Sequence, residues 1–281
     1  MWDPELGDVD AIIDRALRED LAAGDVTARA TVPLELTARA ELVAKAETVV
    51  CGLAVAERVF LRLDGHAHWE ARHPDGTAVP RGTVIAVVDG NARALLAAER
   101  TALNLVQRMC GIASTVRAYV TAAAGRCRVT DTRKTMPGLR SLDRYAVRCG
   151  GGHNHRNDLG SGVLIKENHI RCAGGIAKAI VAARAHAPHG MRIECEVTTL
   201  VEVDQALSAG ADVILLDNMD DGMVAQSVER IAGRALIEVS GNVDLERVGR
   251  VAGLGIDLVS VGALTHSVRA ADVSLLFEYR T

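Results

Sequence analysis

The chain has 281 residues, of which 49% are hydrophobic and 24% are charged, and its formal net charge at pH 7 is -4. This composition excludes a disordered chain and allows one large domain or two. The near-neutral charge and the scarcity of aromatic residues (2 Trp, 3 Tyr and 2 Phe) argue against nucleic acid as a partner, because such a surface needs clustered cations or stacking platforms.

The cysteines and the N-terminus bear on the cellular compartment. Six cysteines are spread through apolar segments without a CxxC pair, which is typical of free thiols in a reducing cytosol. The first ten residues, MWDPELGDVD, contain neither a basic nor an apolar signal region. No stretch approaches the roughly 18 consecutive apolar residues of a membrane span. The sequence therefore predicts a soluble, cytoplasmic protein with no membrane partner.

The first part of the chain predicts strands with helices between them. Residues 8–21 carry apolar side chains at helical spacing, and the helix is expected to end before Gly24. Strand-like patterns cover 37–50 and 83–88, and an amphipathic helix is expected to open near Gly52. A long helix rich in Ala and Leu follows from Ala92 onward. This order predicts an N-terminal domain of mixed helices and strands.

After Gly125, six short apolar segments alternate with helical stretches, and each segment ends in polar residues. The segments are 127–134, 162–169, 191–197, 212–218, 235–242 and 257–263. The pattern predicts parallel β/α units repeated into a barrel, in which the carboxyl ends of all strands open into one mouth. A doubly wound open sheet is the alternative, but it would gather its polar residues at one switch point rather than after every strand.

The polar residues at these strand ends suggest three walls of a binding site. The cationic wall consists of Arg133, Lys134, His155, Arg156 and Lys166, the acidic wall of Glu196 and Asp217, and the third of turns at Ser240, Gly241 and Gly262. Cations suit a polyanionic substrate, carboxylates bind a divalent metal or ribose hydroxyls, and turns that open helices offer N–H groups to phosphate. The predicted chemistry is a transfer reaction on a phosphorylated sugar.

Six motifs in order resemble one known family. They are TDTRKT from Thr130, the run Gly150-Gly151-Gly152 ahead of Asn154-His155-Arg156, LIKENHI from Leu164, ILLDN from Ile214, VSGN from Val239 and VGALTHS from Val261. Each motif is weak alone, but the ordered set is specific. Together with EDLAAGDVT near the N-terminus, the chain resembles the quinolinate phosphoribosyltransferases, also called carboxylating nicotinate-nucleotide pyrophosphorylases.

The resemblance implies a reaction and a fold. Quinolinate and phosphoribosyl pyrophosphate would give nicotinate mononucleotide, pyrophosphate and CO2 for NAD synthesis, with Mg2+ as the cofactor. The implied fold class is α/β, with an N-terminal open-faced α/β sandwich domain over residues 1–110, joined by the tail 270–281. A C-terminal α/β, TIM-like barrel over 111–269 would carry the active site. The resemblance also implies a homodimer, or a higher homo-oligomer built from dimers.

The resemblance also assigns roles to individual residues. Quinolinate would be bound by Arg100, Arg133, His155, Arg156 and Lys166. Phosphoribosyl pyrophosphate would be bound by Lys134, Glu196, Asp217, Ser240, Gly241 and Gly262. The catalytic residues would be Lys134, Lys166, Glu196 and Asp217, and the metal would be held by Glu196 and Asp217, directly or through water. Either lysine could deliver the proton that the product needs at C2, and the sequence leaves this choice open.

Arg100 is expected to act across a dimer. It precedes every barrel strand, on a helix expected to pack outside the barrel, yet the resemblance places it at the substrate. A two-fold related neighbour could bring it to the mouth of the partner subunit.

Three alternatives stay open at this point. Two are enzymes of related fold: a nicotinate phosphoribosyltransferase, and a paralogue associated with molybdenum uptake. A monocarboxylate substrate would need fewer cations than Arg100, Arg133, His155 and Arg156 supply. The third is a catalytically silent barrel, which would have no reason to keep costly charges in its mouth.

Overall fold

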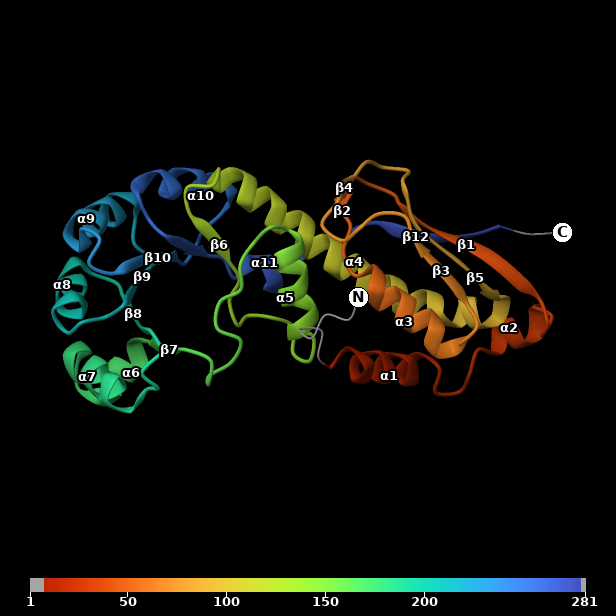
Figure 1. Ribbon diagram of the computed structural model, residues 1–281, viewed down its shortest axis with the longest axis horizontal. Helices are drawn as coiled ribbons and strands as arrows, with labels where there is room; N and C mark the ends of the chain where they lie inside the picture. The colour runs from red at the N-terminus through yellow and green to blue at the C-terminus, as the bar shows by residue number, and fades with distance from the viewer. Residues whose placement is uncertain (1–7, 279–281) are drawn as a thin grey trace. The chain divides into compact units, whose positions relative to one another are not determined.

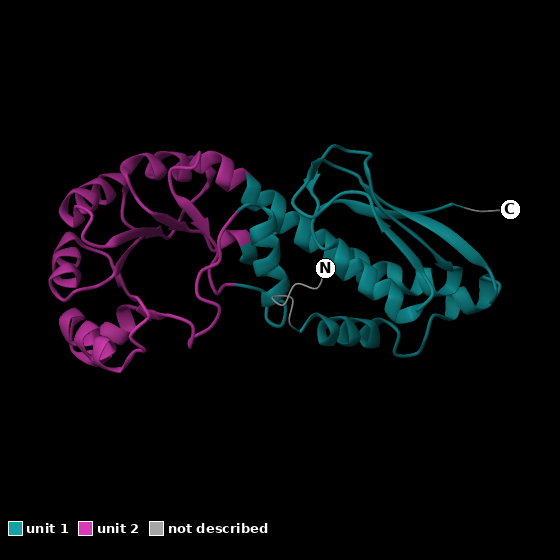
Figure 2. Cartoon of the chain, viewed as in Figure 1, with its two compact units in different colours: residues 1–117, 135–151, 265–281 teal, residues 118–134, 152–264 magenta. Residues whose placement is uncertain are grey.

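The computed structural model describes residues 8–278. The chain divides into two compact units, which Figure 2 shows in two colours. Unit 1 consists of residues 1–117, 135–151 and 265–281, and unit 2 of residues 118–134 and 152–264. Within the described range, no helix is both long enough and apolar enough to cross a bilayer.

The residue ranges of these units differ from those of the expected domains, and the expected domain boundary at residue 110 stays a prediction. Helix α4 (Ala92–Ala123) runs through that boundary, and its residues up to Arg117 belong to unit 1. The segment 135–151 also groups with unit 1, because the fully buried Asp143 accepts two hydrogen bonds from the guanidinium of Arg108, at 2.8 and 2.7 Å.

Unit 1 contains most of the helices and strands expected in the first part of the chain. Its elements are α1 (Val9–Asp20), α2 (Val26–Thr31), β1 (Thr37–Ala44), β2 (Thr48–Val49), α3 (Leu53–Leu63), β3 (His68–Ala71), β4 (Ala78–Val79), β5 (Val84–Asn91), most of α4, α5 (Arg140–Cys149) and β12 (Val273–Glu278). The short helix α2 was not predicted. It forms because Asp25 caps it, accepting a hydrogen bond from the backbone N–H of Ala28 at 2.8 Å.

The main sheet of unit 1 is antiparallel, in the order β12-β1-β5-β3 (Figure 1). Ala40 and Leu42 on β1 are fully buried, whereas Arg39 lies on the other face and forms a 2.9 Å ion pair with Asp89 of β5. One face is therefore apolar and the other polar. This alternation confirms the predicted open-faced sheet.

Unit 2 is the predicted array of parallel β/α units. Its strands are β6 (Arg128–Thr130), β7 (Val163–Ile165), β8 (Ile193–Val197), β9 (Val213–Asp217), β10 (Leu236–Ser240) and β11 (Leu258–Ser260). Its helices are α6 (Glu167–Ala173), α7 (Ile176–His186), α8 (Leu200–Ser208), α9 (Asp221–Ile231), α10 (Leu245–Val251), the 3-10 turn η2 (Ala252–Leu254) and the start of α11 (Ala263–His266).

The strand order of unit 2 decides between the two predicted architectures. The sheet runs β6-β11-β10-β9-β8-β7, with every pairing parallel. From β7 to β11 the strands follow chain order, so the sheet has no point at which that order reverses. A doubly wound sheet requires such a switch point. The barrel-like prediction is confirmed, with β6 and β7 as the two edges of the sheet (Figure 1).

Candidate active site

The register of the parallel sheet brings the polar strand ends to one rim. Asp217 at the end of β9 pairs in register with Ser240 of β10, and Ser240 pairs with Ser260 of β11. Ser260 pairs in turn with Thr130 of β6. These four residues therefore lie in a row at the carboxyl edge of the sheet, where the binding sites of β/α barrels lie.

A cavity of about 310 Å³ opens at this rim. Seven of the residues singled out from the sequence line it: Arg133, Lys134, His155, Arg156, Lys166, Asp217 and Ser240. Thr132, one of the polar residues expected at a strand end, also lines it, and four further lining residues were missed: Leu164, Leu215, Glu238 and Ser260. The cavity thus combines a cluster of cations with two carboxylates and hydroxyl groups inside unit 2.

The other four predicted residues do not line this cavity. Glu196 lies next to it, because its carboxylate forms an ion pair with the ammonium group of Lys166. Gly241 directly follows Ser240, and Gly262 lies two residues beyond the end of β11. Arg100 lies on the part of α4 that belongs to unit 1, and its place at the substrate stays a prediction.

A buried carboxylate positions the cationic wall. Asp131, fully buried after β6, accepts 2.7 Å hydrogen bonds from the backbone N–H of His155 and from the side-chain amide of Asn154. The backbone of His153 also pairs with β6, donating to Val129 and accepting from Asp131. The segment 153–156 is therefore held beside β6, with the side chains of His155 and Arg156 at the mouth.

Two guanidinium groups face the same cavity. Burial and the nearby charge of Arg133 lower the pKa of Arg156, so the two groups are close enough to repel each other. Arg156 also donates a 2.9 Å hydrogen bond to the carbonyl of Gly162, which fixes its orientation. Two adjacent guanidiniums are suited to a ligand that carries more than one negative group.

His155 sits above two glutamates inside the barrel. Its Nδ1 accepts a 2.7 Å hydrogen bond from the backbone N–H of Arg156, and its Nε2 lies 3.3 Å from Glu194 and 3.6 Å from Glu238. Burial lowers the pKa of His155, but the hydrogen bond to Glu194 and the two carboxylate charges outweigh it and raise the pKa overall. Burial and the charge of Glu194 raise the pKa of Glu238 to about 7.

The sequence contained a signal for these two glutamates. In IECEV and LIEVS, an acidic residue interrupts an otherwise apolar strand. Glu194, Glu196 and Glu238 all carry this signal, but only Glu196 was selected, because it lies nearest a strand end. Alternation along a barrel strand instead points every second residue toward the interior.

The acidic wall is formed by neighbouring carboxylates. Burial and the charge of Glu196 raise the pKa of Asp217, while Lys166 and Lys134 oppose this shift. Asp217 accepts a 2.7 Å hydrogen bond from the side chain of Asn218. Two neighbouring carboxylates, of which Asp217 lines the cavity and has its pKa raised by the charge of Glu196, fit a bound cation, which would relieve their repulsion.

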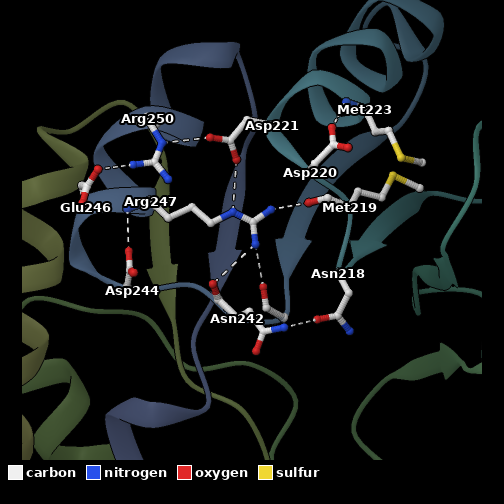
Figure 3. Close-up of polar contacts among 11 residues, drawn as sticks. Asn218, Met219, Asp220, Asp221, Met223, Asn242, Asp244, Glu246, Arg247 and Arg250 are labelled. Carbon is white, nitrogen blue, oxygen red and sulfur yellow. Dashed lines mark hydrogen bonds and ion pairs between the residues drawn. The ribbon is translucent and has the colours of Figure 1, made fainter.

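The turn after β10 is held by a network that Figure 3 shows. Arg247 of α10 donates to the carbonyl of Gly241 at 2.8 Å and to the carbonyl of Met219 after β9. Asn242 donates to Asn218 at 3.0 Å. Gly241 has φ +85°, and a Cβ there would lie 2.3 Å from Oδ1 of Asn218. Only glycine fits this position without displacing its neighbour.

Comparison with known proteins agrees with this geometry. The profile described as "Quinolinate phosphoribosyl transferase, C-terminal domain" matches residues 112–276, and the corresponding N-terminal profile matches residues 25–110. The chain belongs to the quinolinate phosphoribosyltransferase family.

Relatives of this quinolinate phosphoribosyltransferase match the chain over nearly their whole length. The nicotinate-nucleotide pyrophosphorylase (carboxylating) of Mycobacterium leprae (strain TN) is 43% identical over 270 residues, covering 94% of this chain and 95% of that protein. A probable nicotinate-nucleotide pyrophosphorylase (carboxylating) of Bacillus subtilis (strain 168) is 39% identical over 270 residues, covering 94% and 91%. The crystal structure of NadC from Streptococcus pyogenes has a TM-score of 0.93 and 40% identity, covering 99% of each chain.

Proposed function

We propose that this chain uses the mouth of unit 2 to join quinolinate to phosphoribosyl pyrophosphate, yielding nicotinate mononucleotide, pyrophosphate and CO2 for NAD biosynthesis. Membership of the family supports the reaction. The observation that carries the assignment to this cavity is its pairing of two adjacent guanidiniums with Asp217 and its neighbour Glu196. One wall suits a dicarboxylate, and the other suits a ribose and a cation.

Quinolinate binding follows from the cationic wall. Each carboxylate of the substrate can receive paired N–H donors from one guanidinium, from Arg133 or from Arg156. Asp131 and Gly162 hold the segment of His155 and the guanidinium of Arg156 in place before the substrate arrives. His155 adds positive charge when protonated, which its raised pKa favours. The ring is thereby oriented with its nitrogen toward the sugar.

Phosphoribosyl pyrophosphate binding follows from the acidic wall and the turns. Glu196 and Asp217 would accept hydrogen bonds from the ribose hydroxyls, and the turn at Ser240 and Gly241 would donate N–H groups to the 5′-phosphate. The same two carboxylates would hold Mg2+, directly or through water, because oxygen donors are what this cation prefers. The bound cation would neutralise the departing pyrophosphate.

The bond changes need few protein groups. The pyridine nitrogen attacks C1 of the ribose while the bond to pyrophosphate breaks, and nearby carboxylates favour the cationic transition state. The C–C bond to the 2-carboxylate then breaks, CO2 leaves, and its electron pair remains at C2 beside the positive ring nitrogen. A proton from Lys134 or Lys166, both of which line the cavity, completes the product.

We further propose that the protein acts as a homodimer, or as a larger homo-oligomer of dimers, in the cytoplasm. Arg100 would enter the mouth of the partner subunit and contact quinolinate there. Two observations support a role for Arg100 across the dimer. Arg100 is an exposed residue of unit 1, whereas all the residues that line the cavity belong to unit 2. Nucleic acid and membrane are not proposed as partners.

A substrate comparison tests the proposed function. Purified protein with quinolinate, phosphoribosyl pyrophosphate and Mg2+ is expected to form nicotinate mononucleotide, measured by chromatography. Nicotinate in place of quinolinate is expected to react at least about 100-fold more slowly, because the cations placed for the second carboxylate stay unpaired. Comparable turnover of the two substrates would rule out the dicarboxylate site and favour a nicotinate phosphoribosyltransferase.

Asp217→Asn is expected to weaken the binding of phosphoribosyl pyrophosphate with Mg2+ more than the binding of quinolinate. The substitution replaces an anion on the acidic wall by a neutral group of the same shape. Calorimetry would give both dissociation constants. Asp204→Asn, at an exposed ion pair with Arg230, is the matched control and should change neither. Equal weakening of both ligands by Asp217→Asn would contradict its placement on the sugar side.

A further inference from the structure

Outside the mouth, unit 1 contains a second cluster of chemically reactive side chains. Among residues 8–278, two groups of three side chains have ligand atoms close enough to share a metal ion. One is His155 with Glu194 and Glu238, which belongs to the cavity already described. The other is Cys51, Asp75 and Cys149, and the proposed reaction does not use it.

Three distant parts of the chain meet at this cluster. Cys51 lies two residues before α3, Asp75 lies in the turn between β3 and β4, and Cys149 is the last residue of α5. The two sulfur atoms and a carboxylate oxygen lie within 4.8 Å of one another. Cys51 is fully buried, whereas Cys149 and Asp75 are partly exposed, so the cluster is accessible from one side.

Hydrogen bonds hold the carboxylate of the cluster in place. Asp75 Oδ2 accepts from the backbone N–H of Gly52 at 2.7 Å and from the hydroxyl of Tyr145 at 2.9 Å. Its Oδ1 has a weaker contact, 3.3 Å from the backbone N–H of Leu53. One carboxylate oxygen is therefore firmly bound, and the other keeps a lone pair for a further ligand.

An arginine ties the other two segments together. The guanidinium of Arg117 donates to the carbonyl of Gly150 at 3.0 Å and to the carbonyl of Gly76 at 3.2 Å. These carbonyls directly follow Cys149 and Asp75 in the chain. The arginine thus fixes the spacing between the chain segments that carry two of the three ligands.

The sulfur atoms of Cys51 and Cys149 lie within 4.8 Å of each other. The hydrogen bond from Cys51 lowers the pKa of Cys149, and the charge of Arg148 acts in the same direction. Burial raises the pKa of Cys51. A thiolate is the form of cysteine that binds metals.

We propose that Cys51, Cys149 and Asp75 form a binding site for a thiophilic divalent cation of the zinc class. Two sulfur ligands and one oxygen ligand leave the fourth tetrahedral position for water, on the side that is open to solvent. Two S–metal bonds and one O–metal bond form, each thiol that is still protonated loses its proton to the buffer, and no electron is transferred. The ion and its three anionic ligands carry one net negative charge, which the nearby charge of Arg148 partly offsets.

The site does not depend on the reaction proposed for unit 2. Mg2+ should not compete for it, because Mg2+ prefers oxygen ligands and an octahedral shell. Sulfur ligation therefore distinguishes this site from the acidic wall of the mouth.

Cobalt spectroscopy tests the proposal. Reduced, metal-free protein in excess Mg2+ is titrated with Co2+ and then with Zn2+. We expect one equivalent of Co2+ to give an intense near-ultraviolet band of sulfur-to-cobalt charge transfer, which Zn2+ then abolishes. Titration calorimetry with Zn2+ in buffers of different ionisation enthalpy should show proton release.

Variants locate the site. Cys51→Ala and Cys149→Ala should each remove the band and weaken Zn2+ binding about 100-fold or more. Loss of a residue that only supports a metal ligand typically lowers metal affinity by about 10- to 100-fold. Cys172→Ala, at an exposed cysteine outside the cluster, should bind as the parent does. Asp75→Asn also loses part of its contact with the start of α3, so its circular dichroism must be checked before its affinity is interpreted.

Other results would overturn the proposal. Cobalt uptake without the charge-transfer band, or a band that survives in Cys51→Ala and Cys149→Ala, would place the ion elsewhere. No uptake by the reduced protein would leave the cluster as a helix-capping and thiol-pairing device. A Cys51–Cys149 disulfide found by peptide mapping, without metal uptake after reduction, would likewise rule out the cation site.

Discussion

Arg100→Ala and Lys166→Ala are each expected to lower kcat/KM on the order of 10³-fold. When the two variants are unfolded, mixed and refolded together, about a quarter of the wild-type active sites should be recovered. Each variant removes a cation that would otherwise pair with an anionic substrate, and the group left unpaired is costly. In a symmetric dimer, half of the refolded molecules combine one chain of each kind. Such a molecule has one mouth with both cations and one with neither.

The recovered fraction distinguishes the possible arrangements. It would be measured as active sites titrated per chain, with dimer composition checked by native mass spectrometry. Refolding each variant alone is the control and should recover nothing. If mixed dimers are present but inactive, Arg100 acts within its own chain or has no role at the substrate, and the shared site is wrong.

Arg133→Lys is expected to weaken transition-state binding by about 2–4 kcal/mol and to lower kcat/KM accordingly, although the charge is kept. An ammonium group cannot reproduce the two parallel N–H donors that a guanidinium offers a carboxylate. Arg133 lines the cavity close to Arg156, where one substrate carboxylate would lie.

Steady-state kinetics with quinolinate as the varied substrate would measure this loss. Arg128→Lys is the matched control, since Arg128 is an exposed residue at the start of β6, the strand that precedes Arg133, and it should be near neutral. A near-normal kcat/KM for Arg133→Lys would move Arg133 away from the substrate.

Sequence patterns alone predicted the strands of unit 2 and most of the lining of its cavity. Each strand is short, apolar and followed by polar residues, and parallel strands bring such ends to one edge. Asp217 and Ser240 could therefore be expected to meet before their register was known.

The residues that support the cavity were not predicted. Asp131 stands two positions before Arg133 in the sequence, but its role depends on a turn that brings His155 back to β6. Glu194 and Glu238 act on His155 from two strands far apart in the chain. Such roles depend on long-range contacts, which local periodicity does not encode.

The grouping of 135–151 with unit 1 has the same origin. The placement of α5 depends on the buried pair between Arg108 and Asp143. These two residues are 35 positions apart, and neither stands out in its own segment.

The pairing of β12 with β1 has a consequence for how the protein is made. These strands match residue by residue from Arg39 with Glu278 to Ala44 with Val273, and all of unit 2 is synthesised between them. A growing chain on the ribosome can therefore close the sheet of unit 1 only after the whole of unit 2 has emerged. Until then, one edge of β1 stays open to other chains, which is a hazard for aggregation. Unit 2 lacks this delay, so it can fold first. Closure of the unit 1 sheet is then the step at which newly made chains are most exposed to misassembly.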